Sequence, residues 1–193
     1  MTTENYVNVY GLMGLPGAGK TTAAMILAGE TDSAILRAGK AIRTMLKEQR
    51  GVSDPTSEAL GEFAAQKRQE EGPGFFGTYA KEQVTTLQPG TDESLVIDSF
   101  RHREGVRQVE EMLEVDFTSI MVECPRAVRL KRMQRRGRDD EADFTMKDLE
   151  DRDMRELIDL GVDTLIDYDE DYLIRNNKGK RHLYDRVMDI IND

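Results

Sequence analysis

The chain reads Gly14-Leu15-Pro16-Gly17-Ala18-Gly19-Lys20-Thr21-Thr22 between a short apolar run, Val7 to Met13, and a helical stretch, Lys20 to Gly29. A glycine, four intervening residues, a second glycine, a lysine and a threonine form the pattern of a phosphate-binding loop. Glycines let the backbone turn tightly, so that successive N–H groups point inward at phosphate oxygens. A glycine-rich turn without a ligand is the alternative, and the predicted strand before the loop and helix after it argue against that alternative.

The side chains at the end of this loop predict what it binds. The Lys20 ammonium group would reach the β- and γ-phosphates of a nucleoside triphosphate, and the Thr21 hydroxyl would coordinate Mg²⁺. The positive N-terminus of the following helix would face the same anion. We therefore expect ATP and Mg²⁺ as cofactors, with residues 14–22 forming the binding segment.

Apolar runs alternate with helical patterns along the rest of the chain. Four further strands are expected at Ala34–Arg37, Leu95–Ile97, Phe117–Glu123 and Tyr172–Ile174. Strands separated by helices predict an α/β fold with a five-stranded parallel sheet that helices cover on both faces. Ligands of such sheets bind at the carboxyl ends of the strands. The glycine loop, Asp98, Cys124 and Asn176 all fall at such ends.

Local patterns also predict where individual helices begin. Asp54-Pro55 is typical of a helix cap followed by a first-turn proline. Val106, Val109 and Leu113 have the spacing of a buried helical face, and His102 precedes that face as a helix-start residue. These patterns fix the approximate order of the helices along the chain.

Composition and charge limit the classes of function. Hydrophobic residues make up 38% of the 193 residues, the net charge is −10, and Cys124 is the single cysteine. An acidic chain lacks the basic footprint of a general nucleic-acid binder. A lone cysteine without an apolar membrane segment or export pattern favours a reducing cytoplasm. The exception is a basic stretch from Arg126 to Arg138, which indicates either an anion site or a solvated helix face.

Motifs beyond the loop resemble the nucleoside monophosphate kinase superfamily of P-loop proteins, and above all its archaeal adenylate kinase/dephospho-CoA kinase-like members. The resemblance covers nearly the whole chain and rests on Gly39-Lys-Ala-Ile-Arg43, Asp54 to Pro73, Val96-Ile-Asp98-Ser-Phe-Arg101, Arg152-Asp-Met-Arg155 and Asp171 to Asn176. It implies a three-layer α/β/α sandwich with a core at 1–38, 75–136 and 151–193. It further implies an acceptor-binding insertion at about 39–74 and a lid at about 137–150.

The same resemblance implies roles for individual residues. Catalytic roles fall to Lys20, Asp98, Arg132, Arg136, Arg152 and Arg155, and Asp98 also joins Thr21 in holding Mg²⁺. Arg132 and Asn176 would contact the donor nucleotide, while Gly39, Arg43, Arg101 and Arg138 would bind the acceptor. The alternative for the arginines is a solvated helix stripe or plain surface ion pairs, such as Asp148 with Arg152 and Asp151 with Arg155.

Two departures from the family pattern bear on the acceptor. Lys40 stands where an aspartate is usual, and Ser99 stands where a glycine is usual. A sugar hydroxyl needs a base, whereas a nucleotide phosphate is already an anionic nucleophile. Lys40 therefore favours a small nucleotide acceptor, a (deoxy)nucleoside monophosphate, bound by a monomer or homodimer. Transfer to a dephospho-CoA hydroxyl with Asp98 as base, and a regulatory ATPase without a small acceptor, are the alternatives.

Overall fold

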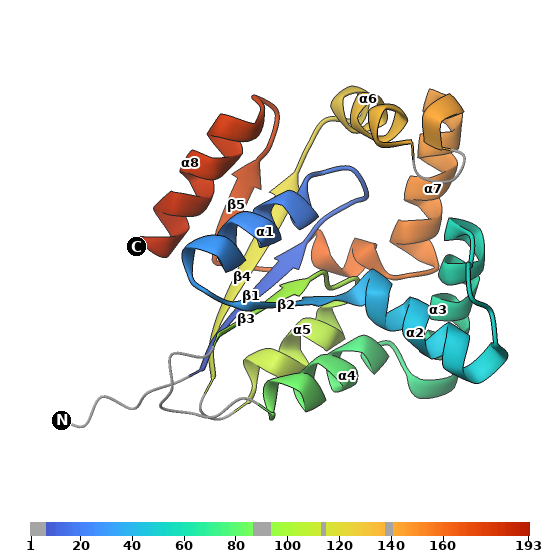
Figure 1. The fold of residues 1–193 in the computed structure, drawn as a ribbon, viewed down its shortest axis with the longest axis horizontal. Helices are drawn as coiled ribbons and strands as arrows, with labels where there is room; N and C mark the ends of the chain where they lie inside the picture. The colour runs from blue at the N-terminus through green and yellow to red at the C-terminus, as the bar shows by residue number, and fades with distance from the viewer. Residues whose placement is uncertain (1–6, 87–93, 113–114, 138–140) are drawn as a thin grey trace.

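The computed structural model describes residues 7–86, 94–112, 115–137 and 141–193. A five-stranded, fully parallel sheet forms the centre of the molecule, with strand order β2-β3-β1-β4-β5 (Figure 1). The strands are β1 (Val7–Met13), β2 (Ala34–Arg37), β3 (Ser94–Asp98), β4 (Val115–Glu123) and β5 (Tyr172–Arg175). The predicted α/β fold with a five-stranded parallel sheet is therefore confirmed.

Helices cover both faces of this sheet. On one face lie α1 (Lys20–Glu30) and α8 (Lys180–Ile191), and on the other lie α4 (Phe75–Val84) and α5 (Arg103–Glu110). Leu27 of α1 and Val187 of α8 are fully buried in the first layer, as are Val106 and Val109 of α5 in the second. The two layers shield the apolar strands from water on both sides, which is the condition that a parallel sheet requires.

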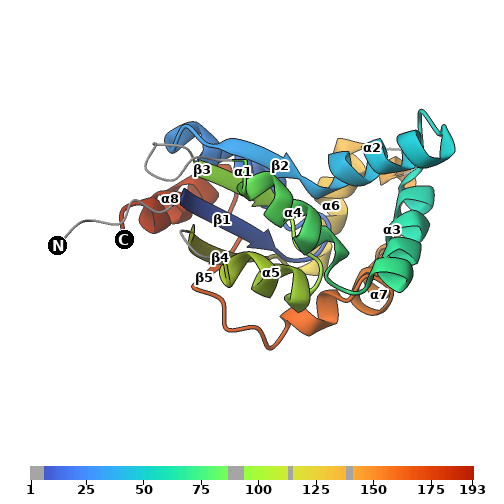
Figure 2. The same ribbon diagram turned by 90° about the horizontal axis from the view of Figure 1, so that it is seen from below.

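The remaining helices gather beyond the carboxyl ends of the strands, as both views show (Figures 1 and 2). They are α2 (Ala38–Arg50), α3 (Ser57–Glu71), α6 (Arg126–Arg136) and α7 (Met146–Ile158), with short 3₁₀ helices η1 (Glu141–Asp143) and η2 (Val162–Leu165). A small separate core of Ile42, Leu46, Phe63 and Leu160 joins α2 and α3 to the segment after α7. This cluster of elements overhangs the edge of the sheet where ligands of such folds bind.

The start of α3 differs from the expectation drawn from Asp54-Pro55. The N-cap is Thr56, whose hydroxyl accepts a hydrogen bond from the Ala59 N–H at 3.2 Å. The prediction of Asp54 as the cap was wrong. The helix begins at Ser57, so Thr56, which is also suited to capping, lies three residues before the backbone N–H that it accepts. Leu113 of the expected α5 face lies outside the described residues, and His102 is the α5 N-cap as predicted.

No helix among the described residues has both the length and the apolar character needed to cross a bilayer.

Candidate functional site

The loop between β1 and α1 has the backbone of an anion cradle. Gly14 and Gly19 adopt φ angles of +127° and +110°, which side-chain-bearing residues rarely adopt. A Cβ at Gly19 would collide with the Asn176 amide, and one at Gly14 would collide with the Val122 carbonyl oxygen. Gly19 also caps α1, so the free N–H groups of the first helical turn open onto the loop. This geometry fits a phosphate group.

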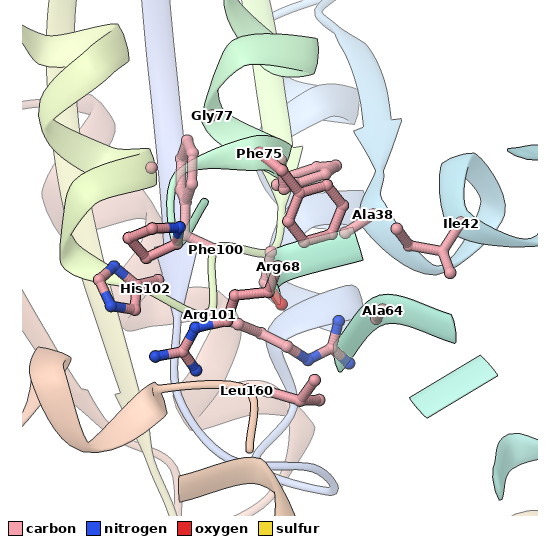
Figure 3. Close-up of a pocket in the computed structure, with 14 residues that line it drawn as sticks. Ala38, Ile42, Ala64, Arg68, Phe75, Gly77, Phe100, Arg101, His102 and Leu160 are labelled. Atoms are coloured by element: carbon pink, nitrogen blue, oxygen red, sulfur yellow. The ribbon is translucent and has the colours of Figure 1, made fainter. Parts of the chain in front are cut away.

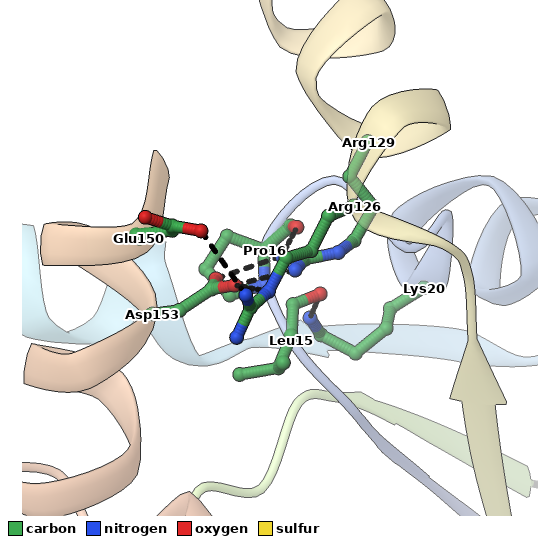
Figure 4. Close-up of polar contacts among 7 residues, drawn as sticks. All are labelled: Leu15, Pro16, Lys20, Arg126, Arg129, Glu150 and Asp153. Carbon is green, nitrogen blue, oxygen red and sulfur yellow. Dashed lines mark hydrogen bonds and ion pairs between the residues drawn. The ribbon is translucent and has the colours of Figure 1, made fainter. Parts of the chain in front are cut away.

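Lys20 follows this cradle directly and is held close to it. Its ammonium group donates a hydrogen bond to the Leu15 carbonyl oxygen at 3.0 Å, across the loop (Figure 4). Burial, followed by the positive charge of Arg101, lowers the pKa of Lys20 to about 8, while Asp98 and Glu156 oppose the change. Lys20 is therefore within electrostatic reach of residues at the ends of other elements.

Thr21 and Asp98 meet beside the same loop. The Thr21 hydroxyl donates to the Asp98 carboxylate at 2.7 Å, although the two residues are 77 positions apart. Asp98 ends β3, is 8% exposed, and lies opposite Leu12 of β1 and Arg37 of β2 in the sheet. A hydroxyl and a carboxylate are hard oxygen donors, the kind that Mg²⁺ takes alongside substrate phosphates. The pair fits the predicted metal site.

Arg132 of α6 and Asn176 after β5 converge on the outer side of the loop. Arg132 donates to the Ala18 carbonyl at 3.1 Å and to the Asn176 side-chain oxygen at 3.2 Å. The Asn176 amide donates to the same Ala18 carbonyl at 2.7 Å. Cys124, half-buried, accepts a hydrogen bond from Arg132 at 3.3 Å. Arg132 and Asn176, the two residues predicted to contact the donor nucleotide, thus lie against the glycine-rich loop.

A buried ion pair that sequence reasoning did not assign supports the loop from α7. Arg129 and Asp153 are each 2% exposed at the side chain and form two parallel hydrogen bonds (Figure 4). Arg129 also donates to the Pro16 carbonyl at 3.0 Å. Since Arg129 is buried, the face of α6 that it shares with Arg132 is no solvated stripe.

Arg136 and Arg152 meet at a second unpredicted carboxylate, Glu141 of η1. Arg136 forms a two-pronged ion pair with Glu141, and Arg152 donates to it at 2.7 Å. The Glu141 side chain is 1% exposed. Asp148 belongs instead to a capping box with Thr145, so the surface pair of Asp148 with Arg152 does not occur. Sequence reasoning missed Glu141 because no local motif marks it.

A pocket opens at the end of β3, between α2, α3, α4 and the segment after α7 (Figure 3). Its lining is mostly apolar and aromatic, and includes Ile42, Phe75, Phe100 and Leu160. Arg68 and Arg101 bring two positive charges to it. Arg68 donates to the Asp159 carbonyl at 2.9 Å, and Arg101 donates through Nε to Glu156 at 2.7 Å.

The other predicted acceptor and lid residues lie around this pocket without lining it. Gly39 and Arg43 are exposed on α2, whereas their neighbours Ala38 and Ile42 line the pocket. Arg155 of α7 is half-buried, with its side chain facing Gly61 of α3. Arg138 lies outside the described residues.

Comparison of the sequence with known proteins identifies archaeal relatives. A family model described as "AAA domain" matches residues 11–155. The UPF0200 protein of Halobacterium salinarum is 30% identical over 188 residues, which cover 96% of this chain and 93% of the relative. The UPF0200 protein of Pyrobaculum aerophilum is 35% identical over 153 residues, or 78% of each chain.

Solved structures of kinases share the fold. Deoxyadenosine kinase from M. mycoides with bound dATP superimposes with a TM-score of 0.58 at 14% identity, over 97% of this chain and all (100%) of that one. Shikimate kinase from Acinetobacter baumannii gives a TM-score of 0.52 at 18% identity, over 98% of this chain and 93% of that one. The chain therefore has the fold of these kinases, and it belongs to the AAA domain family and to the UPF0200 proteins.

Proposed function

We propose that this protein transfers the γ-phosphoryl group of ATP, with Mg²⁺, to a small phosphate-bearing acceptor, a nucleoside monophosphate. The observation that carries the proposal is the position of Arg101. It lines an apolar pocket, and after burial its positive charge is the next largest cause that lowers the pKa of Lys20 in the phosphate-binding loop. A cation that belongs to both sites suits an acceptor whose phosphate must lie next to the γ-phosphate of the donor.

The lining of the pocket supports the class of acceptor. The half-buried rings of Phe75 and Phe76 offer apolar surface to a flat ring, and Arg68 with Arg101 offers charge to a phosphate. An acceptor phosphate is an anionic nucleophile, so the reaction needs alignment and charge neutralisation rather than a base. This chemistry agrees with the exposed Lys40 at the start of α2, where a carboxylate base is absent.

The residues around the loop would then act together in an in-line displacement. An oxygen of the acceptor phosphate attacks the γ-phosphorus, and the bond from that phosphorus to the bridging oxygen breaks as ADP leaves. Lys20 and the loop N–H groups hold the donor phosphates, and Arg101 holds the acceptor. Mg²⁺, held through Thr21 and Asp98, would neutralise charge on the β- and γ-phosphates. Segments 39–74 and 137–150 would close over the substrates and exclude water.

A hydroxyl acceptor is the second candidate. Asp98 is a buried carboxylate at the end of β3, positioned near both the loop and the Arg101 pocket. The kinases with the same fold include proteins named for shikimate and deoxyadenosine. In this protein the Asp98 carboxylate accepts the Thr21 hydrogen bond, which favours a metal role over a base.

The test is ADP release from ATP and Mg²⁺ with a panel of ribo- and deoxyribonucleoside monophosphates, dephospho-CoA and shikimate. We expect one monophosphate to raise turnover far above background hydrolysis, and Lys20→Met to abolish that turnover. Activity with dephospho-CoA alone would replace the proposal by the hydroxyl-kinase candidate. Slow hydrolysis that no acceptor stimulates would leave a regulatory ATPase.

A further inference from the structure

Helix α7 buries two carboxylates on the face where an amphipathic helix normally places apolar side chains. Leu149, Asp153 and Glu156 are 0%, 1% and 7% exposed, and Leu160 continues the same stripe beyond the helix end. Burying a charge is costly unless a partner compensates it. Asp153 is compensated by the equally buried Arg129, and Glu156 by Arg101.

These two ion pairs differ in what surrounds the arginine. The Arg129 side chain is 2% exposed, so its pair with Asp153 is closed to any ligand. The Arg101 side chain is 36% exposed and lines the pocket, while the Glu156 side chain beneath it is 10% exposed. The second pair therefore joins a fixed carboxylate to a cation that a ligand can reach.

The geometry of the Arg101 contact leaves the outer edge of the guanidinium group available. Glu156 accepts from Nε of Arg101 at 2.7 Å. Within the described ranges of the chain, the side-chain hydrogen bonds of Arg101 involve Nε alone. Four of the five guanidinium N–H groups, those of the two terminal nitrogens, therefore have no side-chain hydrogen bond to any described residue and can bind an anion.

Glu156 remains charged in this environment. Burial alone would raise the pKa of its carboxyl group, but the charge and hydrogen bond of Arg101, with Lys20 and Arg152, lower it overall. Above the pH range in which glutamate ordinarily titrates, Glu156 is therefore ionised. Its carboxylate then gives Arg101 a fixed partner wherever the protein stays folded.

We propose that Glu156 is a positioning residue: by binding Nε of Arg101, it aims the two terminal nitrogens of that arginine at the phosphate of the acceptor. The proposal rests on the acceptor site described under the proposed function, and it deepens that function by naming the residue that orients the acceptor-binding cation. Glu156 itself touches no substrate.

The experiment compares Glu156→Ala, which removes the partner of Arg101, with Glu156→Gln, which keeps a hydrogen-bond acceptor of the same length. The Arg101 Nε–H signal in a ¹⁵N-edited NMR spectrum, assigned by its loss in Arg101→Lys, reports the contact directly. Inorganic phosphate is titrated with the phosphate-binding loop saturated by a non-hydrolysable ATP analogue and Mg²⁺. Glu150→Ala, which removes an exposed carboxylate from the same helix and its pair with Arg126, is the matched control.

We expect the Arg101 signal of the wild type and of Glu156→Gln to shift and saturate with phosphate. In Glu156→Ala we expect the signal to merge with those of mobile arginines and phosphate affinity to fall about tenfold, as the loss of an oriented charge-assisted contact implies. The acceptor kcat/KM should fall about 10- to 100-fold for Glu156→Ala, with ATP binding unchanged. Glu150→Ala should behave as the wild type in every measurement.

The direction of the change separates positioning from charge alone. Both variants remove a negative charge near an anion site, so a purely electrostatic role predicts tighter phosphate binding in Glu156→Ala as well as in Glu156→Gln. That result, an unaltered Arg101 signal in Glu156→Ala, or no response of Arg101 to phosphate in the wild type would overturn the proposal. If no monophosphate supports turnover but the NMR pattern holds, the proposed acceptor is wrong and the positioning of an anion-binding arginine stands.

Discussion

At the scale of single residues, Lys20 supplies a positive charge to the phosphate-binding loop, but its surroundings disfavour the charged, protonated form of its side chain. Burial and Arg101 lower the pKa of Lys20 to about 8, against the opposing charges of Asp98 and Glu156. Donor phosphates supply negative charge to the same point, so their binding favours the protonated lysine. Proton binding by Lys20 and nucleotide binding are therefore linked.

This linkage predicts how nucleotide affinity changes with pH. Raising the pH through about 8 removes the Lys20 proton, so affinity for a non-hydrolysable ATP analogue should fall about tenfold between pH 7 and pH 9. Lys20→Arg keeps its charge over that range and serves as the control. Calorimetric titrations at several pH values measure the effect, and a wild-type profile as flat as that of Lys20→Arg would contradict it.

Residues of the loop could be predicted from the sequence because their role belongs to a local backbone pattern. Thr21 and Lys20 follow the glycines directly, and Asp98 ends an apolar strand. Glu156 and Glu141 could not, since their importance comes from partners brought near by folding. Glu156 pairs with Arg101 across 55 positions, and the resemblance marked its neighbours Arg152 and Arg155 but not Glu156 itself.

At the scale of elements, the start of α3 shows how two equally good local signals compete. Asp54 and Thr56 both have side chains suited to capping, and Pro55 is tolerated in a first turn. In the structure Thr56 accepts the Ala59 N–H, while Asp54 is exposed. The order of strands and helices followed from apolar patterns, but two suitable caps only two residues apart could not be told apart by a local pattern.

Substitution of the two candidate caps distinguishes them. Thr56→Ala should lower the free energy of unfolding by about 1 kcal/mol, since it leaves a helix-end N–H without its acceptor. Asp54→Ala should change it by less than about 0.5 kcal/mol, as expected at an exposed position. Urea unfolding of both variants provides the values, and a larger loss for Asp54→Ala would show that the cap is misassigned.

At the scale of the whole molecule, α7 connects the glycine-rich loop after β1 to the pocket at the end of β3. Asp153 binds the arginine that holds Pro16, Glu156 binds Arg101, and Leu160 packs with α2 and α3 just beyond the helix end. The first residues of α7 belong to the proposed lid at 137–150, and its Arg155 faces Gly61 in the proposed insertion at 39–74. The sequence pointed to Arg152 and Arg155 of this helix, whereas the roles of its buried carboxylates, Asp153 and Glu156, depend on partners that only folding brings near.

The buried pair of Arg129 and Asp153 gives a test of this connection. Asp153→Ala leaves the Arg129 charge buried and should lower the free energy of unfolding by about 3–5 kcal/mol. The double variant Arg129→Met with Asp153→Met fills the space with apolar atoms and should recover most of that loss. Thermal and chemical unfolding measure both. Equal stability of the single and double variants would mean that the buried charge is not what destabilises the single one.

The two carboxylates inside α7 also constrain how this chain can change over generations. Substitution of either acid leaves an arginine without its partner, and substitution of either arginine leaves an acid without its partner. A sequence with only one member of a pair changed therefore folds or functions less well than a sequence with both members kept or both changed. Positions 129 and 153, and positions 101 and 156, should accordingly covary among descendants of a common ancestor, whereas Glu150 on the open side of the helix is free to drift alone.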